Sequence, residues 1–309
     1  MSHHHSHHHA PGNGSHRPLL LALLLTLGFA VVEAVAGILS GSLALLGDAG
    51  HMLTDSLSLG LAAAAALIAR RPPSPRHSYG LGRAETLAAL VNAGLMIVVV
   101  FAIGIEAVAR LQEPVQVRGG MVTVVAIAGL LINLAAAWLL AGHQQNLNVR
   151  AALLHVIGDL LGSVAALVSG VVIMVWGWTT IDPLLSLAIA ALILVSALRV
   201  LREALHALLE GVPLSLDTNE IGRALVEVDE VLEVHDLHIW SLSAEQVALS
   251  AHLVLDDIQG WQRVLPASRE MLASRFGIHH VTLQPECLVQ RVDIDRIRPA
   301  GKDEKPEQA

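Results

Sequence analysis

Charged residues are scarce in this sequence, and cysteine is nearly absent. Only 15% of the 309 residues are charged, whereas 54% are hydrophobic and the mean hydropathy is +0.60. A soluble domain carries about 25% charged residues, so the long apolar runs of this chain indicate a membrane protein. The single cysteine, Cys287, excludes an intrachain disulfide.

Signatures of several other protein classes are missing as well. The net charge of −8 argues against a nucleic-acid partner, because an acidic protein repels phosphate. The sequence has no Walker loop to support ATP-driven pumping and no His-Glu-x-x-His helix to support a membrane metalloenzyme. The first apolar run continues past the length of a signal peptide without a clear cleavage site, and we interpret it as a retained membrane span.

Six apolar segments precede a more polar C-terminal part. Each is long enough for the roughly 20 residues of a membrane-spanning helix, and helices satisfy their own backbone groups in lipid. Gly41 alone, between two serines, separates the first two segments and predicts a tight hairpin. The fold class expected for residues 18–208 is an all-α transmembrane bundle of six helices, at approximately Leu19–Ser40, Ser42–Ala69, Ala84–Leu111, Gly120–Ala141, Ala151–Trp176 and Ile181–Leu205.

The arginines predict the orientation of this bundle. Cytoplasmic connections carry an excess of Lys and Arg. The connections on one side hold only Arg110 and Arg118. The side that includes both chain ends is therefore predicted to be cytoplasmic, because it holds Arg17, Arg70, Arg71, Arg76, Arg83, Arg150, Arg199 and Arg202.

The C-terminal part, residues 209–290, has the pattern of a small cytoplasmic α+β domain. Its expected element order is α-β-β-α-β. The segments are a helix, two strands, a helix and a strand at Asp217–Val228, Val231–Leu242, Gln246–Leu255, Trp261–Phe276 and Ile278–Gln284.

Two polar segments flank these parts. Residues 1–17 form a His-rich arm, which is either a native cytoplasmic metal-collecting segment or a purification tag. Residues 291–309 are expected to be a disordered tail.

Histidine and aspartate occur together inside two of the predicted spans. His51 and Asp55 are four residues apart in the second span, and His155 and Asp159 are four apart in the fifth. This spacing puts each pair on one helix face, and ionisable residues within spans are usually functional. Two imidazoles and two carboxylates would make a tetrahedral Zn²⁺ site. The alternative, two sets of satisfied polar helix contacts, is weakened by the presence of two copies.

Two further residues of the first half are weaker candidates. Asp48, one turn before His51, either supports the metal ligands or begins its helix in the hairpin. His77, between the second and third spans, is either a ligand of a secondary metal site or an ordinary loop histidine.

The soluble part holds a second group of candidate ligands. His235 and His252 lie on its first two predicted strands, and Glu286 lies near the end of the last one. His279 and His280 lie near the beginning of that last strand. Gln284 is a poor metal ligand, so a site here is expected to be reduced or altered.

The segments LGDAGHMLTD, HSYGLGRAETLAALVNA, HVIGDLLGS and VHDLHIWSL together resemble the cation diffusion facilitator family, in particular its zinc-exporting subgroup. The resemblance covers about Leu19 to Glu286. It implies a homodimeric metal/proton antiporter with a metallochaperone-like cytoplasmic domain. It also implies that the transport site consists of His51, Asp55, His155 and Asp159. In this family a histidine at the position of His51 accompanies zinc preference.

The function expected from these observations is export of Zn²⁺ in exchange for protons across a bilayer, which we expect to be a bacterial inner membrane. Zn²⁺ would be the transported substrate and a candidate regulatory metal of the cytoplasmic domain. Ligand identity alone does not fix the metal. An exporter of broader range (Cd²⁺, Co²⁺, Ni²⁺, Fe²⁺ or Mn²⁺), a channel and a metal-sensing membrane protein therefore stay open as alternatives.

Overall fold

The computed structural model describes residues 16–141, 147–243 and 246–287, without the side chains of residues 16–23, 140, 147–152, 154 and 155. The predictions for most of the His-rich arm and for the C-terminal tail lie outside the described residues. The chain divides into two compact units, residues 1–209 and residues 210–309.

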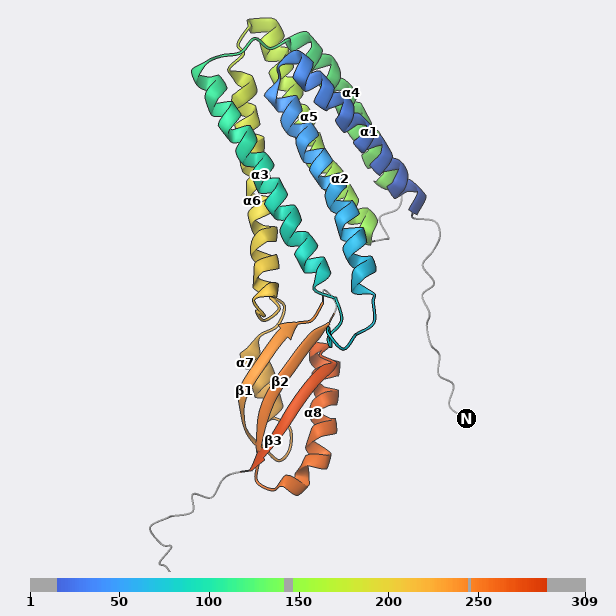
Figure 1. Ribbon diagram of the computed structural model, residues 1–309, viewed down its shortest axis with the longest axis vertical. Helices are drawn as coiled ribbons and strands as arrows, with labels where there is room; N and C mark the ends of the chain where they lie inside the picture. The colour runs from blue at the N-terminus through green and yellow to red at the C-terminus, as the bar shows by residue number, and fades with distance from the viewer. Residues whose placement is uncertain (1–15, 142–146, 244–245, 288–309) are drawn as a thin grey trace, which may run out of the picture. The chain divides into compact units, whose positions relative to one another are not determined.

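The first unit consists of six helices, as the apolar segments predict (Figure 1). Their ends differ from the predicted ones by a few residues. The helices are α1 (His16–Ser40), α2 (Leu43–Ala69), α3 (Ala84–Gln112), α4 (Gly119–Ala141), α5 (Leu147–Trp176) and α6 (Ile181–Leu208).

These helices have the length and composition of membrane spans. Within the described residues, five are long and apolar enough to cross a bilayer, and α1 contributes a shorter apolar stretch, Leu24–Ser40. Large apolar side chains also point outward, and Ile38, Ile105 and Trp138 are more than 70% exposed. An outer surface of this kind suits lipid rather than water.

Helix α2 lies at the centre of the bundle, in contact with α1, α3, α5 and α6. Alanines form much of the buried core among α1, α2, α4 and α5, including Ala36, Ala44, Ala126 and Ala166. Small residues allow helix backbones to approach closely in a membrane. Polar side chains that face inward from α2 and α5 are therefore brought near one another.

The second unit is the predicted α+β domain, with a three-stranded sheet in the order β1-β2-β3 (Figure 1). Strand β2 pairs antiparallel with β1 and parallel with β3. The last strand begins at His280 and ends at Cys287, whereas the predicted strand is Ile278–Gln284. The elements are α7 (Thr218–Val226), β1 (Val231–Ser241), β2 (Val247–Leu255), the short 3₁₀ helix η1 (Ile258–Gly260), α8 (Trp261–Phe276) and β3 (His280–Cys287).

The two faces of this sheet differ in composition. Alternate residues of β2, from Leu249 to Leu255, join side chains of α7 and α8 in one hydrophobic core. Because side chains alternate along a strand, His252 points to the opposite face. His235 is paired with His252 in the register of β1 and β2, and paired residues share a face. The face away from the core therefore collects the histidines.

A buried carboxylate holds the hairpin between α1 and α2. Asp182, near the start of α6, accepts hydrogen bonds from the Ser42 hydroxyl at 2.6 Å and the Leu43 amide at 2.6 Å. It also accepts from the Ala44 amide at 3.4 Å and the Ser169 hydroxyl at 3.1 Å. The first amides of a helix have no partner within it, so Asp182 caps α2 from another part of the chain.

We predict that Asp182→Ala lowers the stability of the bundle. The substitution leaves buried donors without an acceptor, at a cost of about 2–3 kcal/mol. The melting temperature of the purified protein in detergent should fall by roughly 5–10 °C. Glu113→Ala, at an exposed acid after the end of α3, is the control and should leave the melting temperature unchanged. Equal melting temperatures for both variants would contradict the capping role.

Candidate metal centres

The first candidate centre lies between α2 and α5. His51 and Asp55 are one turn apart on α2, and the His51 Nε2 atom lies 3.4 Å from Asp55 Oδ2. The same nitrogen lies 3.9 Å from Oδ1 of Asp159, which α5 contributes. Two ligands bonded to tetrahedral zinc at about 2.0–2.1 Å are roughly 3.4 Å apart. The His51 imidazole therefore lies at about that separation from each of the two carboxylates.

His155 completes the predicted set only at the level of the backbone. It lies on α5 one turn before Asp159, so both residues are on the same face of that helix. Its side chain lies outside the described residues. The structure thus brings the His51 side chain near those of Asp55 and Asp159, and it places His155 on the same face of α5 as Asp159.

A cavity of about 370 Å³ opens beside this centre. Asp48, His51 and Asp55 line it from α2, and Asn92 lines it from α3, where it accepts a hydrogen bond from Ser58. Its other walls come from α5 and α6 and are mostly apolar. The polar part of its lining therefore offers carboxylates and an imidazole to a cation.

Asp48 is buried and lies close to the backbone of α5. A Cβ added to Gly162 would lie 2.3 Å from the Asp48 Oδ1 atom, so a larger residue there would displace this carboxylate. The side chain of Asp48 is 2% exposed. Asp48 therefore belongs to the inner wall of the cavity rather than to the hairpin.

His77 is not among the residues that line the cavity beside the first centre. It is in the loop after α2, where its backbone pairs with that of Ser74. Its Nδ1 atom is 3.5 Å from the Ser74 hydroxyl. This arrangement stabilises the loop, and the groups of metal-ligating side chains found in the described residues do not include His77.

The second candidate centre lies on the open face of the sheet in the α+β unit. The His235 Nε2 atom is 2.9 Å from Glu286 Oε2, and the His252 Nδ1 atom is 2.7 Å from Glu286 Oε1. The two imidazole rings are 5.1 Å apart between centroids. In the parallel register Glu286 pairs with Val254, two residues beyond His252 on the same face. One carboxylate therefore bridges two imidazoles.

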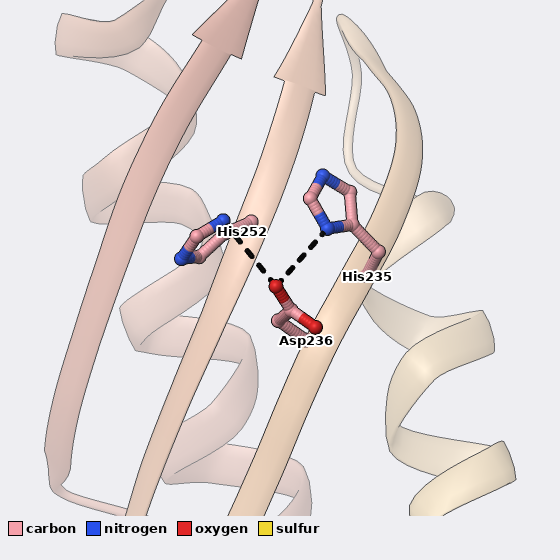
Figure 2. A group of neighbouring side chains, drawn as sticks. All are labelled: His235, Asp236 and His252. Atoms are coloured by element: carbon pink, nitrogen blue, oxygen red, sulfur yellow. Dashed lines mark ion pairs between the residues drawn. The ribbon is translucent and has the colours of Figure 1, made fainter.

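Asp236 also belongs to this centre, and the sequence analysis missed it. Its Oδ2 atom lies 3.6 Å from His235 Nδ1 and 3.9 Å from His252 Nδ1. Figure 2 shows the Asp236 carboxylate pointing toward both imidazoles. Neighbouring residues of a regular strand face opposite sides. Here the register shifts between His235 and His238, and Asp236 has a φ of 49°. This bulge brings Asp236 to the same side as His235.

The contacts with Glu286 also shift protonation equilibria. The hydrogen bond to Glu286 raises the pKa of His235 above its ordinary value of 6.5. The same bond lowers the pKa of Glu286 below its ordinary value of 4.5. Without metal, the pair therefore favours an imidazolium beside a carboxylate.

His279 and His280 lie away from this centre. His280 pairs with Ala248, whereas Gln284, four residues later on β3, pairs with His252. Four residues of strand span about 13 Å, so His280 and the preceding His279 are near the other end of the strand. The parallel register, which the sequence does not specify, separates them from His235 and His252.

Comparisons with known proteins agree with a transporter. Residues 19–209 match the family model for the cation efflux transmembrane domain, and residues 213–287 match the model for the cytoplasmic domain of cation efflux proteins. The zinc transporter ZitB of Escherichia coli K12 is 44% identical over 291 residues, which cover 93% of each chain. The cadmium, cobalt and zinc/H(+)-K(+) antiporter of Bacillus subtilis 168 is 38% identical over 286 residues, or 91% of each chain.

Part of the chain is also similar to a solved structure. It is the metal-bound C-terminal domain of the CzcD transporter from Cupriavidus metallidurans, with 38% identity and a TM-score of 0.22. The match covers 23% of this chain and 99% of that one. The two matching family models, the apolar helix bundle and the relatives aligned along nearly the whole chain lead to one conclusion: the chain belongs to the cation efflux family of multi-pass membrane transporters.

Proposed function

We propose that the protein exports Zn²⁺ from the cytoplasm in exchange for protons, through a transport site made of His51, Asp55, His155 and Asp159. The observation that carries this proposal is the approach of His51 on α2 to Asp159 on α5, 3.9 Å apart, beside a cavity within apolar helices. Two carboxylates would balance the charge of a dication in this low-dielectric interior, where either alone is costly.

The same side chains supply the exchange of protons. An imidazole or carboxylate must lose its proton before it can bind a metal, so metal binding releases protons. Histidine titrates near neutral pH. We infer that Zn²⁺ displaces protons from the site when it opens to the cytoplasm. The helices then move so that the site opens to the other side of the membrane. Protons from that side displace Zn²⁺, and the ion leaves.

The relatives favour zinc as the metal without restricting the choice to zinc. One relative is named a zinc transporter, and another is named an antiporter of cadmium, cobalt and zinc. Two imidazoles in a four-ligand site suit Zn²⁺. Cd²⁺ and Co²⁺ are therefore the alternative substrates to test beside Zn²⁺.

The arrangement in the membrane follows from the charge pattern. We propose that both termini and the α+β unit are cytoplasmic, in a bacterial inner membrane, and that the protein is a homodimer. The functional divisions of the chain would be an N-terminal arm (1–17), a transmembrane domain (18–208), a cytoplasmic domain (209–290) and a tail (291–309).

We further propose that the α+β unit binds a regulatory Zn²⁺ through His235, Asp236, His252 and Glu286. The ligand atoms of the first three all lie within 4.8 Å of one another. Two imidazoles and two carboxylates are suitable zinc ligands. A bound ion would replace the imidazolium–carboxylate contacts that now join β1, β2 and β3. Occupancy of this site would thereby make the conformation of the α+β unit depend on the cytoplasmic metal concentration.

We predict that Asp159→Ala abolishes zinc transport. The substitution removes a ligand and half of the negative charge contributed by the two aspartates, so transport should fall on the order of 100-fold or more. The measurement is zinc uptake into proteoliposomes that contain a zinc-sensitive dye and a pH-sensitive dye. Asp256→Ala, at an exposed position of the α+β unit, is the control and should transport like the native chain.

Two results would contradict the proposed function. Native-rate transport by Asp159→Ala would remove this residue from the transport site. Zinc flux through the native chain without an opposite proton flux would indicate a channel instead of an exchanger.

We predict that replacing both His235 and His252 with alanine lowers the amount of Zn²⁺ that the purified full chain retains. The transmembrane site is unaltered in this double variant, so only part of the bound metal should be lost. Elemental analysis after equilibrium dialysis measures the ratio of zinc to protein. His279→Ala combined with His280→Ala is the matched control, because these histidines lie near the other end of β3. An equal loss in both double variants would argue against the assigned ligands.

We predict that zinc binding to the α+β unit weakens as the pH falls. The pKa of His235 is raised above 6.5, so protons compete with the metal at higher pH than they would at a free histidine. Zinc titrations between roughly pH 6 and 8 on the full chain carrying Asp159→Ala would isolate this site. Affinity should decrease on the acidic side of the raised pKa. A constant affinity over this range would show that His235 is not a ligand.

A further inference from the structure

Glu33, in the second half of α1, is a buried acid that has no hydrogen-bond partner among the described residues. Its side chain has no exposed surface. Among the described residues, no hydrogen-bond donor reaches either carboxyl oxygen. An ionised carboxylate in this environment is unfavourable by several kcal/mol unless other groups compensate its charge. The state of lowest free energy for an isolated Glu33 side chain is therefore the neutral, protonated acid.

Asp182 provides a comparison within the same bundle. It is equally buried, yet two hydroxyl groups and two backbone amides donate to its oxygens. Donors of this kind are what a buried carboxylate requires. The contrast indicates that the surroundings of Glu33 are not built to hold a permanent negative charge.

The packing of α4 leaves space for this side chain. A Cβ added to Gly129 would lie 3.1 Å from Oε1 of Glu33 and 2.7 Å from the ring of Phe29. One turn further along α4, the Asn133 amide donates to the Ser163 hydroxyl of α5 at 3.1 Å. Asn133 and Ser163 are both buried, and Ser163 lies one turn beyond Asp159. A hydrogen-bonded pair of buried polar groups thus lies one helical turn from Gly129 and one turn from Asp159.

The acidic groups that act on Glu33 are Asp48 and one residue of the proposed transport site, Asp159. Helix α1 packs against α2 and α4. Helix α4 has no titratable residue, and the titratable residues of α2 are Asp48, His51 and Asp55. The electrostatic neighbours of Glu33 are Asp48 and, from α5, Asp159. Both repel a negative charge at Glu33, and a dication bound at Asp159 would attract one.

We propose that Glu33 is a proton-binding residue of the transport cycle, protonated while the metal site is empty and ionised while it is occupied. The proposal rests on the proposed function, because its metal is the exported one. When the dication binds, the O–H bond of the Glu33 carboxyl breaks and the proton passes to water. When the metal leaves, the carboxylate takes up one proton again. Glu33 thereby adds one proton per cycle to those that the metal ligands exchange.

The test compares the native full chain with Glu33→Gln, which has the shape of the neutral acid but cannot release a proton. Protons released per Zn²⁺ bound are measured in detergent by calorimetry in buffers of different ionisation enthalpy. The variant should release about one proton fewer. Infrared difference spectra between zinc-free and zinc-loaded protein should show a protonated carboxyl band lost on binding in the native chain and absent from the variant. Glu106→Gln, at an exposed glutamate of α3, is the matched control and should behave like the native chain.

Unchanged proton release with an unchanged carboxyl band in Glu33→Gln would overturn the proposal. Should that variant not fold, Glu33→Asp keeps the acid and should shift the frequency of the band, and an unshifted band would assign it to another residue. Neither readout requires transport. Failure of zinc export by the native chain would therefore refute the proposed function, while proton release on binding would still decide the role of Glu33.

Discussion

Removing an ionised carboxylate from water costs several kcal/mol in an apolar helix bundle, and this cost constrains every buried acid of the protein. Asp182 meets the constraint with four hydrogen-bond donors. Asp159 meets it with the neighbouring imidazole of His51 and, in our proposal, with a transported dication. Glu33 has neither, and a proton is the remaining way to neutralise it. The described part of the bundle holds four buried acids, with Asp48 as the fourth. In our proposals the other three serve a structural, a ligand and a proton-binding role.

The α+β unit obeys a different constraint, the alternation of side chains along a strand. This alternation sends one set of β2 residues into the core and leaves His252 on the open face. The antiparallel register places His235 beside it, and the parallel register brings Glu286 within reach of both. Asp236 does not follow the alternation, because the bulge in β1 turns it to the same side as His235. The exposed position of this centre allows metal to equilibrate with solvent, in contrast to the enclosed site between α2 and α5.

Sequence reasoning succeeded where local patterns determine structure. Apolar length predicted six helices, Gly41 predicted the tight hairpin, and the four-residue spacing placed His51 near Asp55. It could not predict contacts that depend on which helices pack together. The bond between the Leu43 amide and Asp182 joins residues 139 positions apart. The packing of Glu33 beside Gly129, the bulge at Asp236 and the register of β3 are likewise set by tertiary structure.

The crossover connection from β2 to β3 affects when the metal centre of the α+β unit can form. Parallel neighbours require a long connection, here η1 and α8, before β3 can pair with β2. Glu286 lies 51 residues after His235 and reaches it only through this pairing. During synthesis on the ribosome the histidines therefore emerge long before their shared carboxylate. A chain truncated before β3 would keep both imidazoles but lack the group that joins them, so an assembled centre marks a fully folded domain.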